Sequence, residues 1–560
     1  MLRAQPLATR YSGVMNDAPV LSSRLAVLVL LAVAWVAPAH AADPSLYDFV
    51  RTHVDPVTGT LTPEALTLPD EPATRRYSRI RWVPGALEGL GTRHMKWDGS
   101  EKASRTARLL ELVAGGNDAA EPALYDLLRT DDVVTFYNDA LDLAAARVRN
   151  PEPELHDMAR RLATESPDRG AVKFGIAMLG SFGDEHDLQI VQTLALHDEF
   201  GLYAAEAIAE IAPDRQRALY EMARKLDGWG RIEAVSRMVA TTDPTLRRWL
   251  LTEGFRNSVT PQYLAYQCAT IADLAGALRD LPPKAKPDLP LLIGAADLIQ
   301  SLVKPGPAAG FNRYEDAPQV AAVFLQNIQK RREAVTFYLA ARALRDYVAT
   351  LTTSPEQSAS PKTDDALRSG IVRDAQSVDT DVARWTPDQE RDVAALATRV
   401  VDDPSWHRHI VAAILDDRSD LDQAEAAAQK LGVKTFDLHL RRLSQHSANP
   451  RRWDLAFAAA EPQDVNRLVG AAKGTSGPAL EAVLHGVARY PGIGMDIVET
   501  SLTDSDEHVR RAAVETLVRW GGLYLRNVSV RLALNNAARH ESDEALKARM
   551  FALLNLGTLP

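Results

Sequence analysis

One acidic run has a spacing that suits metal chemistry, the letters DDRSD from Asp416 to Asp420. Residues four positions apart lie on the same side of a helix, so the two outer carboxylates could hold Mg²⁺. The run follows Ile414 and Leu415, where we expect a helix to end, and no second Mg²⁺-binding motif follows downstream. An acidic turn between two helices is therefore the preferred interpretation.

The histidines are scattered and suggest a metal site only if the fold brings them together. His407 and His409 are two positions apart, so they do not share a helix face. His186 and His197 each adjoin an aspartate, in GDEHD and LHDEF, and we interpret both as polar turn residues. The chain contains no HExxH, GxSxG, P-loop or dinucleotide-binding motif. The sequence therefore assigns no catalytic, cofactor-binding or metal-binding residue.

An arginine-rich segment near the N-terminus is a candidate binding site. It contains Arg75, Arg76, Arg79 and Arg81, followed directly by Trp82. Guanidinium groups beside aromatic rings can bind phosphate, sulfate or an acidic partner. We predict these residues as candidate partner-binding residues. The alternative is an N-terminal cap whose arginines pair with acidic residues of the rest of the protein.

The clearest structural element is a predicted helical hairpin at 494–522, GMDIVETSLTDSDEHVRRAAVETLVRWGG. Its second helix has a stripe at the period of one helix face: Val509, Ala512, Ala513, Thr516, Leu517 and Trp520. Asp506 and Glu507 lie at the expected helix start, and Gly521 and Gly522 at its end. A hairpin this small cannot bury its apolar face alone, so we expect it to stack on neighbours.

A second copy of the pattern begins 37 residues downstream (542 − 505), where Ser-Asp-Glu recurs. The two hairpins, at 494–522 and 529–557, resemble the HEAT-like helical repeats, which have a turn aspartate and a basic residue early in the second helix. Asp504 or Asp506 matches the turn aspartate here, and Arg510 matches the basic residue. The resemblance implies an irregular α-solenoid of stacked hairpins, a HEAT/ARM-like superhelix, and carries no catalytic residues with it. Arg549 replaces a small residue in the second copy, which indicates a capping repeat.

Composition narrows the possible functions. The formal net charge of −10 argues against a general nucleic-acid binder, because phosphate binding needs a basic surface. Cys268 is the single cysteine, so neither an intrachain disulfide nor a cysteine-based metal centre can form. We expect it to be a packed core thiol. The aromatic content of 6% and the abundant alanine favour closely packed helices.

The N-terminal residues 1–41 have the features of a Sec-type signal peptide. Arg24 precedes the apolar run LAVLVLLAVAWV, and Ala39-His40-Ala41 matches a cleavage site, with Ala42 as the first mature residue. The run is too short to span a bilayer comfortably, since a span needs about 20 residues. We therefore expect a periplasmic or secreted protein without a transmembrane segment in the mature chain. Whether translation starts at Met1 or Met15 is left open.

The rest of the chain divides by composition. We predict an irregular segment at 42–100, a helical-repeat region at 101–350, a linker or long loop at 351–384, and HEAT-like repeats at 385–560. The 351–384 segment contains TTSPEQSASPKT, a composition typical of mobile connections. It marks the predicted main boundary, although a long loop within one continuous array fits equally well.

Together these features predict an all-α, exported binding protein without a cofactor. Its expected role is a non-catalytic scaffold or adaptor that holds a protein or peptide partner on a concave surface in the cell envelope. The alternative is an α/α-toroid enzyme that acts on a polysaccharide or other small substrate through loop carboxylates. A pocket that collects Asp416, Asp420 and further acids would favour the enzyme.

Overall fold

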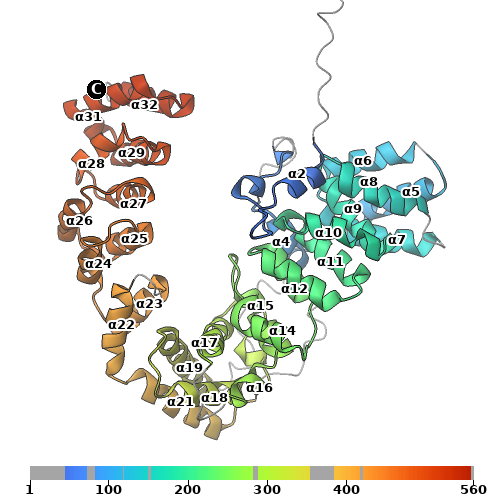
Figure 1. Ribbon diagram of the computed structural model, residues 1–560, viewed down its shortest axis with the longest axis horizontal. Helices are drawn as coiled ribbons and strands as arrows, with labels where there is room; N and C mark the ends of the chain where they lie inside the picture. The colour runs from blue at the N-terminus through green and yellow to red at the C-terminus, as the bar shows by residue number, and fades with distance from the viewer. Residues whose placement is uncertain are drawn as a thin grey trace, which may run out of the picture. The chain divides into compact units, whose positions relative to one another are not determined.

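The computed structural model describes residues 44–71, 82–117, 119–148, 153–281, 288–353, 384–416 and 420–556. The chain forms two compact units, Met1–Glu233 and Ala234–Pro560. The secondary structure of the described residues is helical, apart from an isolated bridge between Val54 and Leu61. These helices pack in neighbouring pairs, which confirms the predicted all-α class (Figure 1).

The first unit is built around one helix that is buried on all sides. Its elements are α2 (Leu46–Thr52), η1 (Pro63–Leu66), α4 (Ala86–His94), α5 (Ser100–Ala114), α6 (Ala120–Thr130), η2 (Val133–Thr135), α7 (Tyr137–Arg147), α8 (Pro153–Glu165), α9 (Arg169–Phe182), η3 (Glu185–Asp187), α10 (Leu188–Leu194), η4 (Asp198–Phe200), α11 (Gly201–Ile211) and α12 (Arg215–Lys225). Helix α9 packs against α6, α7, α8 and α11. Every residue from 171 to 179 is consequently buried.

The second unit consists of further helices that pack in the same pairwise manner. After α13 (Trp229–Ser236), which crosses the boundary, they are α14 (Pro244–Trp249), the π-helix η5 (Leu250–Gly254), α15 (Gln262–Ile271), α16 (Leu274–Arg279), α17 (Leu289–Val303), η6 (Phe311–Arg313), α18 (Ala317–Ile328), α19 (Thr336–Thr353), α21 (Pro387–Val401), α22 (Ser405–Leu415), α23 (Leu421–Leu431), α24 (Phe436–Leu443), α25 (Pro450–Ala459), η8 (Pro462–Asp464), α26 (Val465–Ala471), α27 (Gly477–Val487), α28 (Met495–Ser501), α29 (Glu507–Trp520), α30 (Gly522–Leu525), α31 (Val528–His540) and α32 (Glu544–Leu556). Cys268 in α15 is fully buried, as expected of a core thiol.

The hairpin at 494–522 forms as the sequence predicts. Helix α29 buries the whole predicted stripe, together with Val514. Asp506 caps its start by accepting a hydrogen bond from the His508 backbone N–H at 2.8 Å. Gly521 ends the helix with a φ of +81°, a backbone conformation that residues other than glycine rarely adopt. Thr516 then donates to the Leu484 carbonyl of α27 at 3.1 Å, which joins this helix to the preceding hairpin.

Successive hairpins of the C-terminal part contact one another in an alternating order. Helices α25, α27 and α29 pack one on the next, and α29 also packs on α32. The other helices of the pairs, α22, α24 and α26, pack on one another in the same way, as do α28 and α31 (Figure 1). Each hairpin therefore covers the apolar face that its neighbour leaves open.

A partly buried ion pair connects the last two hairpins. Arg510 of α29 donates from Nε and Nη2 to the two carboxylate oxygens of Glu541, at 2.7 and 2.9 Å. Glu541 lies in the turn between α31 and α32, and 1% of its side chain is exposed. Arg510 also donates to the carbonyls of Asp504 and Ser505 at 3.0 and 3.1 Å, so it fixes its own turn as well. The hydrogen bond from Arg510 lowers the pKa of Glu541 to about 2.

Several predicted segments lie outside the described residues. They include the signal peptide at 1–41 and most of the predicted linker, whose described flanks are α19 and α21. These two helices pack against each other within the second unit. The structure thus divides the chain at 233/234, and the segment at 351–384 connects two packed helices. Among the described residues, the structure contains no helix with the length and apolarity that a membrane span requires.

Replacing Arg510 tests the link between the last two hairpins. We expect Arg510→Ala to lower the free energy of unfolding by about 1.5–3 kcal/mol, because Glu541 loses charge-assisted hydrogen bonds in a buried turn. Urea unfolding followed by circular dichroism measures this change. The difference from the unmutated protein should shrink as the pH falls from about 4.5 toward 2, since Glu541 then becomes protonated.

Arg511→Ala is the matched control, because its pair with Glu507 is 45% and 48% exposed and should change stability by less than about 0.5 kcal/mol. Equal effects of the two substitutions would contradict the prediction.

Candidate functional site

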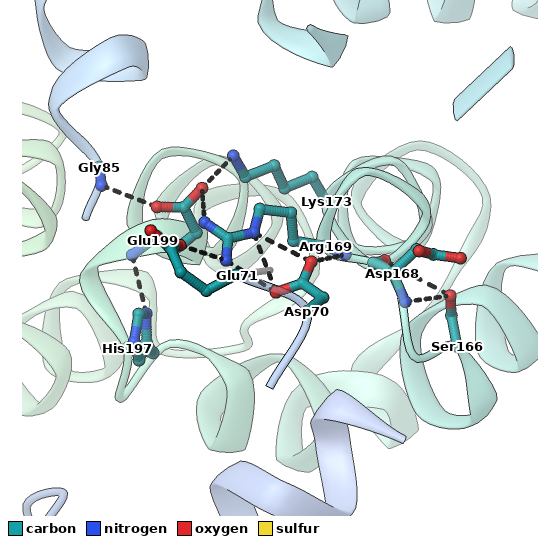
Figure 2. A network of polar contacts seen from close by, with 9 residues as sticks. All are labelled: Asp70, Glu71, Gly85, Ser166, Asp168, Arg169, Lys173, His197 and Glu199. Carbon is teal, nitrogen blue, oxygen red and sulfur yellow. Dashed lines mark hydrogen bonds and ion pairs between the residues drawn. The ribbon is translucent and has the colours of Figure 1, made fainter. Parts of the chain in front are cut away.

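The first unit gathers charged side chains where α9 begins (Figure 2). Arg169 donates from Nη2 to Asp70 Oδ1 at 2.7 Å and to Glu71 Oε2 at 3.0 Å, and from Nε to both Asp70 oxygens. The Arg169 backbone N–H donates to Asp70 Oδ2 at 2.9 Å, so a carboxylate occupies the positive end of the helix dipole. The segment at 70–71 is thereby fixed to the start of α9.

Lys173 lies one turn further along α9, and its side chain is buried. Its Nζ donates to Glu88 Oε1 and to Glu199 Oε1, each at 2.6 Å (Figure 2 shows the Glu199 contact). Burial disfavours the charged ammonium, but the two carboxylates outweigh it and raise the pKa of Lys173. Burial likewise opposes ionisation of Glu199, yet Lys173 and Arg169 lower its pKa to about 2. The remaining partner, Glu88, has its pKa raised by burial.

Glu199 also ties α4 to η4 through the backbone. The Gly85 N–H donates to Glu199 Oε2 at 3.3 Å, just before α4 begins. Gly85 has a φ of +73°, and a Cβ at this position would lie 2.5 Å from the Asp198 carbonyl oxygen. Only glycine therefore permits both the backbone conformation and the close approach. The interaction places α4, α9 and η4 around one buried carboxylate.

His197 caps η4 with its imidazole ring. Nδ1 accepts a hydrogen bond from the Glu199 backbone N–H at 3.1 Å, which requires the proton of the neutral ring to be on Nε2. The residue is 2% exposed, and Nε2 has no hydrogen-bond partner among the described residues. The Leu66 backbone lies beside the ring and favours its protonation, but burial dominates and lowers the pKa of His197 to about 4. The ring is therefore neutral at physiological pH and presents an N–H donor.

Asp198 lies between His197 and Glu199 in the sequence. Its pKa is raised, whereas the pKa of each of its two neighbours is lowered. Burial raises the pKa of Asp198 to about 6, although its Oδ1 accepts a hydrogen bond from the Gly230 N–H at 2.6 Å. Neighbouring acidic residues, Asp227 and Glu199, add to the increase. Three consecutive titratable residues thus have three different electrostatic environments.

A small pocket opens beside this charged group. Its volume is about 240 Å³. Its apolar lining consists of Leu66, Leu68, Trp82, Val83 and Pro84, and its polar lining of Thr67, Glu71, Arg169, His197 and Glu199. The pocket lining therefore combines apolar residues from the chain around 66–68 and 82–84 with a set of polar residues, the polar wall, which come mostly from the α9 start and η4. Such a mixture of apolar surface and a few fixed polar groups is typical of small-molecule sites.

The polar wall is better suited to binding than to acid catalysis. Glu199 stays ionised because Lys173 and Arg169 stabilise its charge, so it is a poor proton donor. His197 has a fixed tautomer whose Nε2–H donates, so it is not a base toward the pocket. The wall can thus offer hydrogen-bond donors and acceptors whose protonation is constant near neutral pH.

Of the predicted partner-binding residues, the structure describes Trp82, which lines this pocket. Arg75, Arg76, Arg79 and Arg81 lie outside the described residues. Asp420 of the acidic run caps α23 by accepting from the backbone N–H groups of two residues that follow it. The parts of the chain that the structure describes contain no group of three or more His, Cys, Asp or Glu that could hold a metal ion.

The sequence analysis missed the residues that build the polar wall. It interpreted His197 as a polar turn residue, and its Nδ1 does cap a turn, but the same residue lines the pocket. It did not single out Arg169, Lys173 or Glu199. A signal was present in GAVKFGIAMLG, because a lysine inside a continuous apolar run must be buried and must therefore have acidic partners.

The second unit has a different candidate surface, made of exposed apolar side chains. Among the described residues, six of the thirteen exposed large hydrophobic residues lie between 518 and 556. They are Val518 (40% exposed), Leu523 (77%), Val528 (71%), Leu532 (65%), Phe551 (40%) and Leu556 (53%). Val528 and Leu532 are four positions apart on α31 and so share a helix face. Exposed apolar side chains that form a contiguous patch are typical of protein interaction sites, and Val528 and Leu532 are the two here that one helix face brings together.

No protein-family model, curated protein or solved structure matches this chain. The similarity to HEAT-like repeats therefore depends on the pattern of the two C-terminal hairpins alone.

Removing Lys173 should destabilise the first unit. We expect Lys173→Met to lower its free energy of unfolding by about 3–5 kcal/mol, because two buried carboxylates lose their cation. Hydrogen exchange of the amides of α9 and α11, read by mass spectrometry, reports this unit separately from the second. Lys102→Met is the control, since its pair with Asp131 is 47% and 32% exposed and should have little effect. Unchanged exchange in Lys173→Met would show that the buried charges are not coupled to stability.

The pKa values of His197 and Asp198 are shifted in opposite directions. The contributions of these two residues to the free energy of unfolding should therefore change with pH in opposite directions. The folded-state pKa of His197 is about 4, below the ordinary 6.5, so its contribution to stability is lost as the pH falls from 6.5 toward 4. The folded-state pKa of Asp198 is about 6, above the ordinary 3.8, so its contribution grows over nearly the same range. We therefore expect the two to cancel largely in the unmutated protein.

Single substitutions separate these two effects. Relative to the unmutated protein, Asp198→Asn should lose stability as the pH falls from 6.5 to 4.5, by at most about 1.4 kcal/mol per pH unit. His197→Asn, which retains a helix-capping side chain, should gain stability over the same range. Urea unfolding at pH 6.5, 5.5 and 4.5 measures both slopes. Identical pH slopes in all three proteins would refute the assignment.

Proposed function

We propose that this chain is an exported, HEAT-like α-solenoid protein that acts as a non-catalytic scaffold or adaptor, binding a protein or peptide partner in the cell envelope. The observation that carries the proposal is the set of exposed apolar side chains on the last hairpins, above all Leu523, Val528 and Leu532. Side chains of this size are normally buried, and leaving them in water has a free-energy cost of about 25 cal/mol per Å² of apolar area.

The arrangement of the C-terminal helices supports a repeat architecture. Alternate helices pack on one another, and Arg510 links the turn of its own hairpin to the turn of the next through Glu541. In stacked arrays, each unit contacts only its neighbours, and the exposed residues are free to vary and to bind partners. Arg549 is exposed on α32, which supports a capping role for this hairpin.

Enzymatic activity, the alternative, has the pocket of the first unit in its favour. The pocket contains two carboxylates, Glu71 and Glu199, near an aromatic side chain. Both carboxylates, however, form ion pairs with Arg169, at 3.0 and 3.4 Å. A carboxyl general acid needs a raised pKa, whereas that of Glu199 is lowered. The pocket therefore favours ligand binding over hydrolysis by paired carboxylates.

Export is proposed from the sequence of residues 1–41, which ends in the cleavage pattern Ala39-His40-Ala41. The single cysteine, Cys268, is buried and cannot form an intrachain disulfide. The exported chain would therefore depend on packing and ion pairs for its stability. The mature protein would then begin at Ala42.

Site-specific photo-crosslinking in the cells that make the protein tests the scaffold proposal. A benzophenone side chain at Leu532 should yield an adduct of one defined mass with an envelope protein. The same probe at Val57, which is 91% exposed in the first unit, is the control and should yield little. Substituting Val528→Lys, at the adjacent position on the same helix face, should reduce the Leu532 adduct by about tenfold or more, since desolvated apolar contacts dominate such interfaces.

Two outcomes would contradict the scaffold proposal. One is an equal adduct yield from the two probe positions, which would indicate random collisions. The other is a Leu532 adduct that persists unchanged in the Val528→Lys protein. N-terminal sequencing of the same preparation checks export independently, because the mature chain should begin at Ala42.

A further inference from the structure

The pocket of the first unit has no role in the scaffold function, and its walls define the kind of molecule that fits it. Its volume of about 240 Å³ is below the ~300–1,000 Å³ of sites for drug-sized ligands. The ligand must therefore be small, of about monosaccharide size. The lining residues that the structure describes all belong to the first unit.

The polar wall contains donors and acceptors that are held in place by one another. Arg169 is held by Asp70 and Glu71, and Glu199 by Lys173 and the Gly85 N–H. The contact of Arg169 Nη1 with Glu199 Oε1 is long, 3.4 Å, so this guanidinium nitrogen is not saturated by a short hydrogen bond. A bound molecule can thus be recognised without breaking the short ion pairs.

His197 adds an N–H donor whose Nε2–H makes no hydrogen bond of ordinary geometry to the described residues, although the Leu66 backbone interacts with the ring. Its Nδ1 is occupied by the Glu199 N–H, and its Nε2 has no partner in the part of the chain that the structure describes. A buried donor without an acceptor has a free-energy cost of about 1–3 kcal/mol. An oxygen atom of a ligand would remove this cost, because it can accept from Nε2–H.

The charge balance of the described residues argues against a charged ligand. Asp70, Glu71 and Glu199 provide three carboxylates against the two cations Arg169 and Lys173, even when Glu88 is left out of the count. An anion would meet excess negative charge and compete for Arg169. A cation would have to replace Arg169 or Lys173, which already neutralise the carboxylates at short distance.

A hydroxyl group suits this wall, because it both donates and accepts a hydrogen bond. It can donate to Glu71 or Glu199 and accept from His197 or Arg169 at the same time. The apolar lining residues, the half-buried Trp82 with Leu66, Leu68, Val83 and Pro84, offer an apolar surface for C–H groups. We propose that the pocket binds a small, uncharged polyhydroxylated molecule of monosaccharide size, either free or at the end of a glycan.

Isothermal titration calorimetry with defined sugars tests the proposal on the full mature chain. The panel contains glucose and N-acetylglucosamine as neutral probes, glucuronate as the anionic probe, glucosamine as the cationic probe, and the chitobiose disaccharide. We expect saturable binding of at least one neutral probe, with weaker binding of both charged probes. Tighter binding of the disaccharide than of its monosaccharide would indicate a glycan end, and equal binding a free sugar.

Matched variants locate the binding in the pocket. His197→Asn keeps the helix cap but shortens the donor, and Trp82→Ala removes the apolar platform. Each should weaken binding by about tenfold or more. Trp97→Ala is the control, since Trp97 is 37% exposed and lies outside the pocket lining, and it should bind as the unmutated protein does. Circular dichroism of each variant checks that the fold is retained.

A spectroscopic measurement gives a readout that does not depend on the variants folding. In protein labelled with ¹⁵N-histidine, the neutral probe should shift the Nε2 resonance of His197 and leave the Nδ1 resonance in place. The proposal is overturned if no neutral sugar saturates the protein, if glucuronate or glucosamine binds more tightly than the neutral probes, or if His197→Asn and Trp82→Ala bind normally.

Discussion

The burial of the Lys173 ammonium is the interaction on which the first unit depends. A charged amine in the middle of an apolar helix is tolerable only if carboxylates reach it, because desolvating an unpaired charge has a large free-energy cost. Glu88 comes from α4 and Glu199 from η4, so meeting this requirement brings three segments together. The same contacts fix the backbone before α4, through the Gly85 N–H. One charge thereby constrains the position of helices that are far apart in the sequence.

The second unit uses the same principle at several helix ends. Arg510 reaches from α29 to Glu541 in the following hairpin, and Arg256 reaches Asp297 of α17 at 2.6 Å. In each pair one partner is well buried, so the pair adds geometric definition to an otherwise apolar contact. Alanine-rich helices offer smooth faces that can slide or rotate against each other. Fixed charge pairs between neighbouring hairpins oppose such slippage in a chain that has no disulfide.

The pocket arises from the same charged group rather than from a separate active-site motif. Arg169 and Lys173 keep Glu199 ionised, while burial and the Glu199 backbone keep His197 neutral with its proton on Nε2. Because Glu199 and His197 keep the same protonation states near neutral pH, they are poorly suited to proton transfer and well suited to recognition of a ligand by hydrogen bonds. The two proposed roles therefore share one theme, because each is the binding of another molecule.

The sequence by itself determined the helical class and the local form of the best hairpin. The stripe of α29, its Asp506 cap and its Gly521 stop depend on spacing and residue type within one segment, so periodicity predicts them. The role of Arg510 was not predictable in the same way, since its partner Glu541 lies 31 residues away in the next hairpin. Only the tertiary structure decided which residues form the pocket. Its lining residues come from positions as distant in the sequence as Leu66 and Glu199. The burial of His197 and Lys173 likewise depends on contacts between distant segments, which the local sequence pattern does not encode.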